Sequence, residues 1–194
     1  MERKAEYILK LKSELKEVDS EIGKLVIRSD KITVEIKQGY DAMETALRNQ
    51  QSSTREILSE SLMSGNEAWD LVWKYVWSAI KEFNSQAATD INLQFKELEL
   101  SLKSKQSEIR RQLDDSEITA DEIYNEIWNE VWNEFWNVIE EIDRQAAIEI
   151  KQVGEQLEAL TLKKAALTTE IHELLMTGDE AWNVSKEITR SMVE

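Results

Sequence analysis

Few side chains in this sequence could do chemistry. There is one histidine, His172, and no cysteine, so sites that need two imidazoles or a thiolate are excluded. Neighbouring carboxylates such as Glu140-Glu141 are common, but on an acidic helix they are typical of a solvated face. The sequence contains no Glu-x-x-His pair, Gly-x-Ser-x-Gly elbow, phosphate-binding glycine loop or EF-hand spacing. We therefore predict no enzyme activity and no catalytic, cofactor-binding or metal-binding residues.

The most specific pattern is a series of tryptophans at four-residue spacing. On a helical wheel the second triplet flanks an apolar face of about 180°, and Asn and Glu fill the other half. That face is wider than the seam of a two-stranded coiled coil, so it is either buried in a bundle or used for self-assembly, a partner or a membrane surface. The predicted interaction face consists of Trp69, Trp73, Trp77, Trp128, Trp132, Trp136 and Trp182.

These tryptophans belong to an internal repeat. Residues 67–91 align without gaps on residues 126–150, and 11 of the 25 positions are identical. A partial third copy starts at Met176, where the run to Trp182 matches the run from Met63 to Trp69. Each repeat has an apolar face that it cannot bury alone, which favours a structural role over a catalytic pocket.

Three capping boxes, each a Ser or Thr followed three residues later by Glu, mark the starts of helices. They divide the chain into predicted helical blocks at about 1–62, 65–114, 120–175 and 178–193. A fourth match, Ser53–Glu56, is either a further start or without meaning. The predicted caps are Ser64, Glu67, Thr119, Glu122, Thr177 and Glu180.

A heptad seam of apolar residues, alternately three and four apart, runs from Ile8 to Ala46. Residues 25–36 alone also fit a short hairpin, but the seam continues across them and favours a helix. Similar block lengths and short links predict one all-α domain over residues 1–194, with long antiparallel helices and a short C-terminal helix. The arrangement is a three-helix bundle or a coiled-coil-like repeat array. With one reversal near residue 116, residues 69–77 would face 155–163, and 128–136 would face 96–104.

The net charge of −15 disfavours nucleic acid as a partner. Residues 114–194 carry −14 of it, with 6 basic and 20 acidic side chains. A membrane surface is possible but disfavoured, because the polar face is Asn and Glu where lipid binders carry Lys and Arg. No signal peptide or transmembrane segment is expected, so we predict a location in the cytoplasm or in an intracellular or virion assembly.

The runs Ile127–Asn133 and Ala181–Asn183 resemble the Trp-Asn helical repeats of phage tape-measure proteins, which space their aromatic residues differently. The resemblance covers less than a tenth of the chain. Taken together, the patterns predict a non-enzymatic scaffolding protein that acts through helix–helix association, as a homo-oligomer or with a helical partner. Two alternatives are a lipid- or membrane-surface-binding protein that uses the Trp faces, and a designed helical bundle without natural function.

Overall fold

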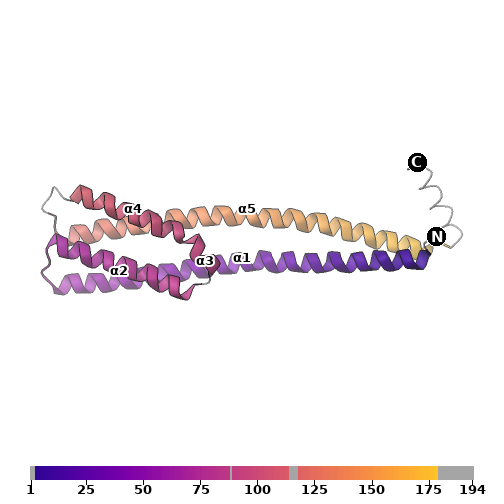
Figure 1. Cartoon of the computed structure of the whole chain (residues 1–194), viewed down its shortest axis with the longest axis horizontal. Helices are drawn as coiled ribbons and strands as arrows, with labels where there is room; N and C mark the ends of the chain where they lie inside the picture. The colour runs from indigo at the N-terminus through magenta and orange to yellow at the C-terminus, as the bar shows by residue number, and fades with distance from the viewer. Residues whose placement is uncertain (1–2, 88, 114–117, 179–194) are drawn as a thin grey trace. The chain divides into compact units, whose positions relative to one another are not determined.

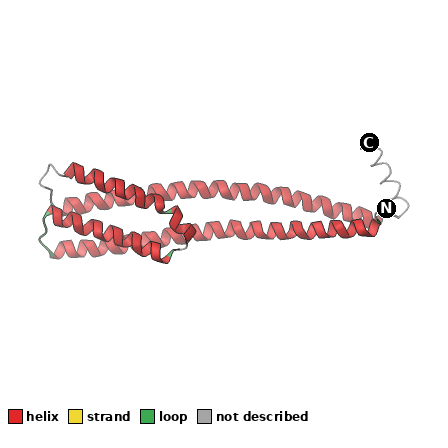
Figure 2. Ribbon diagram, in the orientation of Figure 1, coloured by secondary structure: helices red, strands yellow, loops and turns green. Residues whose placement is uncertain are grey.

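The computed structural model describes residues 3–87, 89–113 and 118–178, and within these ranges all regular structure is helical. Figure 2 shows helices joined by short loops. The all-α prediction is therefore confirmed. The helices, labelled in Figure 1, are α1 Lys4–Glu60, α2 Gly65–Gln86, α3 Thr89–Gln94, α4 Lys96–Leu113 and α5 Ala120–Met176.

The chain forms two compact units, Ile32–Ala147 and Met1–Lys31 with Ile148–Glu194. The first contains the end of α1, all of α2, α3 and α4, and the start of α5; we call it the four-helix unit, because α3 is only a short corner. The second, called the helix pair, contains the start of α1 and the end of α5. Both long helices contribute residues to both units, and the assignment of the chain to one domain stays a prediction.

Helix α1 follows the heptad seam throughout. Residues 25–36 lie inside α1, so the hairpin alternative is wrong. The seam residues Leu11, Val18, Ile36 and Met43 are buried. The match at Ser53–Glu56 does not start a helix either. It lies inside α1, where the buried Thr54 hydroxyl donates a hydrogen bond to the Gln50 carbonyl at 2.6 Å, a bond typical of helix interiors.

Neighbouring long helices in the four-helix unit are antiparallel. Along α1 and α5, Arg55 pairs with Asp121 at 2.7 Å, and Tyr40 donates a hydrogen bond to Asp143. Helix α4 lies against α5, with Lys105 3.0 Å from Glu130. The side chains at the centre of the unit are apolar and fully buried; they include Leu47, Val76, Leu98, Leu102, Ile127 and Phe135.

The block predicted as one helix over 65–114 is instead α2, α3 and α4. Helix α2 ends where Ala87 takes extended backbone angles, φ −79° and ψ 149°. The Asn92 amide donates hydrogen bonds to the Asn84 and Ala87 carbonyls, at 3.0 and 3.2 Å, and so satisfies acceptors that a helix end leaves free. The ring centroids of Phe95 and Phe83 lie 4.9 Å apart across the corner between α2 and α4. The reversal brings the apolar faces of α2 and α4 together, which a straight helix could not do.

The extra reversal changes which segments meet. Trp69 and Trp77 on α2 face Arg110 and Gln106 on α4, so the prediction that residues 69–77 face 155–163 is wrong. Residues 128–136 do meet the predicted region of α4, since Glu134 accepts a hydrogen bond from Ser101. The predicted C-terminal helix over 178–193 falls almost wholly outside the described residues.

Candidate interaction site

The first Trp triplet forms a ladder of rings along α2. The ring centroids of Trp69 and Trp73 are 5.8 Å apart, as are those of Trp73 and Trp77, the latter pair stacked at 25°. Helix α4 covers the ladder, with the Arg110 guanidinium 5.3 Å from the Trp69 ring and the Lys103 ammonium 5.9 Å from the Trp77 ring. The four-residue spacing stacks the rings on one face, and cations over their faces add a favourable electrostatic contact.

The second triplet lies on α5 and is covered by α1. Trp128 is buried, 6.5 Å from the Tyr124 ring. The Trp132 indole donates a hydrogen bond to Gln51 at 3.0 Å, and the Arg48 guanidinium lies 5.1 Å above its ring. Trp136 is different, because 51% of its surface is exposed. In both triplets, basic and amide side chains of a neighbouring helix contact tryptophan rings: those of α4 contact Trp69 and Trp77, and those of α1 contact Trp132.

Most of the predicted interaction face is therefore interior. Trp69, Trp73 and Trp128 are buried in the core of the four-helix unit, and Trp77 and Trp132 are half-buried against it. No ring contact between described residues joins the two triplets. The indole N–H groups of Trp73 and Trp128 have no hydrogen-bond partner among the described residues, so apolar packing is what holds these two rings. Trp182 lies outside the described residues.

Hydrogen bonds at two helix starts follow the predicted capping boxes. At Ser64 the hydroxyl accepts from the Glu67 amide at 3.4 Å, and the Glu67 carboxylate accepts from the Ser64 amide at 2.9 Å. Thr119 and Glu122 make the equivalent bonds at 3.3 and 2.8 Å. The backbone bonds hold the pKa of both Glu carboxyls below the ordinary value. Thr177 instead donates to Glu173 at the end of α5, and its predicted partner Glu180 lies outside the described residues.

The two capped helix starts also touch. A Cβ on Gly65, the first residue of α2, would lie 2.5 Å from the carbonyl oxygen of Ile118, next to the start of α5. Only a glycine leaves room for this close approach. The contact fixes where α2 and α5 begin relative to each other within the four-helix unit.

The helix pair has a different surface. Its buried residues, among those the structure describes, are Leu11, Val18, Val153, Leu167, Ile171 and Leu174. Large apolar side chains remain exposed on both helices, including Leu9 at 66%, Ile27 at 69% and Leu162 at 66%. Two helices bury only the line along which they touch, so side chains beside that line stay accessible.

One flank of the helix pair is cross-linked by polar side chains that are seven or fourteen residues apart along each helix. The bonds are Tyr7 Oη to Glu170 at 2.7 Å, Lys163 Nζ to Glu14 at 2.8 Å, and Arg28 to Glu149 at 2.5 Å. They show that α1 and α5 are antiparallel here, since the partner number falls as the α1 number rises. Pairing with Glu14 raises the pKa of Lys163. Sequence reasoning missed this flank, because it depends on the register between two helices far apart in the sequence.

Among the described residues there is no group of three or more acidic or histidine side chains that could hold a metal ion. None of the described helices is long and apolar enough to cross a membrane. Comparisons of the chain with models of protein families, with curated proteins and with solved structures find no match. The argument about function therefore rests on the geometry of the two units.

Proposed function

We propose that the protein is a non-enzymatic helical scaffold that works through helix–helix association and self-assembles. The observation that carries the proposal is the incomplete burial of the helix pair. Within the described residues it has 6 buried apolar side chains, against 26 in the four-helix unit. Helices with an unfinished apolar surface gain stability by packing against further helices.

The burial of the Trp faces supports the same proposal over lipid binding. A membrane-surface helix needs its aromatic face free to enter the lipid interface. Here Trp69, Trp73 and Trp128 are covered by neighbouring helices, and among the tryptophans that the structure describes only Trp136 keeps half of its surface exposed. The aromatic repeat accounts for the core of one unit, which leaves the other unit for association.

The distribution of charge also favours the helix pair as the associating surface. Residues 32–147 contain 11 basic and 23 acidic residues, a net charge of −12. Residues 1–31 together with 148–194 contain 13 basic and 16 acidic residues, a net charge of −3. Two copies of one chain repel each other where both are strongly acidic, so contact through the less charged unit costs least.

Sedimentation equilibrium of the full chain tests the proposal. We expect the average mass to rise above the 22.6 kDa of one chain as the concentration increases from about 1 μM to about 1 mM. A mass that stays at 22.6 kDa over this range would overturn self-assembly. A parallel arm adds vesicles with anionic lipids. A blue shift of tryptophan emission with vesicles, and no self-association without them, would favour the lipid-binding alternative.

A further inference from the structure

The cross-linked flank of the helix pair has one gap. The seven-residue interval places Glu21 of α1 opposite Gln156 of α5, between the Glu14–Lys163 and Arg28–Glu149 bridges. Among the described residues no hydrogen bond or ion pair joins Glu21 to Gln156. The row of polar bonds along this flank is therefore interrupted between Glu21 and Gln156, while the other three pairs of the row are bonded.

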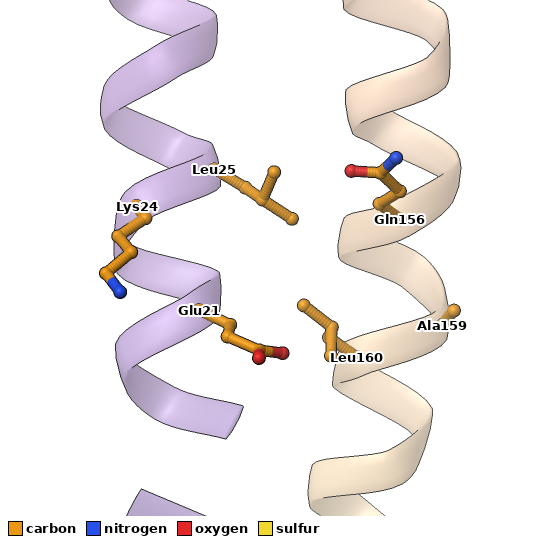
Figure 3. Close-up of a pocket in the computed structure, with 6 residues that line it drawn as sticks. All are labelled: Glu21, Lys24, Leu25, Gln156, Ala159 and Leu160. Atoms are coloured by element: carbon orange, nitrogen blue, oxygen red, sulfur yellow. The ribbon is translucent and has the colours of Figure 1, made fainter. Parts of the chain in front are cut away.

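A groove of about 450 Å³ opens at this gap, lined by Glu21, Lys24, Leu25, Gln156, Ala159 and Leu160. Figure 3 shows Leu25 and Leu160 pointing from the two helices into the space between them, with Glu21 and Gln156 along the same gap. Both leucines are only half-buried. The surface inside the groove is largely apolar, because the long polar side chains contribute their aliphatic stems.

The two walls of the groove share one residue spacing. Each helix contributes residues at positions i, i+3 and i+4, counted from Glu21 on α1 and from Gln156 on α5. Each set ends in a leucine, and the helices are antiparallel, so the two walls are related by an approximate two-fold axis. A two-fold contact between identical chains needs a self-complementary patch.

The charges of the groove suit the same occupant. Glu21 and Lys24 are its only charged residues, so a second copy related by a two-fold axis brings each acid toward the other copy's base. The helix pair around it carries a net charge of only −3, as described above. A partner of strong net charge of either sign has no such match here.

We propose that this groove is the contact at which two copies of the chain associate. Leu25 and Leu160 of the two copies meet across it, and the two helix pairs together make four helices. This inference rests on the proposed self-assembly and identifies its surface. A contact between copies at the groove would explain why the row of polar bonds is interrupted where the two partly buried leucines are accessible.

An arginine on the groove wall tests the proposal. Ala159 is exposed, so A159R keeps a good helix former at a solvated position while filling the groove with a charged side chain. Ala165, also exposed, lies six residues further along α5 on the other flank, so A165R is a control with the same substitution. Circular dichroism establishes that both variants keep the helical content of the parent chain.

Sedimentation equilibrium on the three full-length chains gives the result. We expect A159R to raise the dimer dissociation constant about 30-fold or more and A165R to leave it within about threefold. If the parent chain and both variants dimerise equally, self-assembly stands and the groove is the wrong surface. If the parent chain stays monomeric, both proposals fail. A monomer whose thermal midpoint drops with A159R and not with A165R would assign the groove to a segment of the same chain and overturn a second copy as its occupant.

Discussion

The same two helices behave differently in the two units. In the four-helix unit α1 and α5 are covered by α2 and α4, and side chains such as Leu47 and Phe135 are completely buried. In the helix pair, α1 continues the same heptad seam, yet its seam residues Leu15 and Ile22 are only partly buried. A seam of constant spacing therefore sets where two helices touch, while the number of neighbouring helices sets how much of each side chain leaves water.

The difference in burial predicts a difference in stability that one substitution can measure on one helix. Leu47→Ala, at a site with no exposed surface, should lower the free energy of unfolding by about 4 kcal/mol. Leu11→Ala, at a site in the helix pair that is 5% exposed, should lower it by about 2 kcal/mol, because the shortened side chain leaves a space that water can reach.

Urea unfolding followed by circular dichroism at 222 nm gives both values. Leu9→Ala, on α1 at a site that is 66% exposed, controls for the change in helix propensity. Equal losses for the two leucines would remove the contrast between the units.

Replacing a glycine by alanine should change the stability in opposite directions in the two units. Gly65→Ala should destabilise the chain by about 1–3 kcal/mol, because the new Cβ would meet the Ile118 carbonyl oxygen at 2.5 Å and force the helix starts apart. Gly154→Ala, inside α5 in the helix pair, should stabilise it by about 0.5–1 kcal/mol, because a Cβ there meets nothing within 4 Å and alanine favours the helix. Thermal unfolding of the two variants beside the parent reads out both signs, and a stabilising Gly65→Ala would contradict the close packing at the helix starts.

The smallest predicted effect is a loss of stability at acid pH, and it arises in the four-helix unit. The pKa of Glu67 and Glu122 lies below 4.5 in the folded chain, chiefly because each carboxylate accepts a backbone hydrogen bond at its cap. Their contribution to stability is thus present above pH 4.5 and is lost as the pH falls through the lowered value. In an NMR titration the Glu67 carboxyl should protonate below pH 4.5, and Ser64→Ala should move its pKa back toward 4.5. An unchanged Glu67 pKa in Ser64→Ala would contradict the capping geometry.

Features with a local cause were predictable from the sequence. The α1 seam follows from residues three and four apart on one helix, and the Ser64 and Thr119 caps need only two side chains within one turn. The predicted starts at 65 and 120 agree with α2 and α5 for that reason.

The corner after α2 had no local signal. The tripeptide Gln86-Ala87-Ala88 begins with the last residue of α2, and the same three residues recur at Gln145-Ala146-Ala147, inside α5. One tripeptide cannot specify both outcomes. The corner depends on contacts with residues far away in the sequence. The ring centroid of Phe95 lies 6.3 Å from that of Tyr40 on α1 and 6.5 Å from that of Phe135 on α5. The groove was hidden for a related reason, because the register that leaves Glu21 opposite Gln156 is set by bridges between residues more than 120 apart in the chain.

The indole ladder on α2 also has an optical consequence. Successive rings from Trp69 to Trp77 have centroids 5.8 Å apart, a separation at which their electronic transitions couple and excitation passes from ring to ring. The six tryptophans at 69–77 and 128–136 all belong to the four-helix unit, and their near-ultraviolet signals respond to its packing. With Trp182 replaced by phenylalanine, the intrinsic spectrum of this chain becomes a reporter of one unit, and the other unit is spectroscopically silent apart from Tyr7.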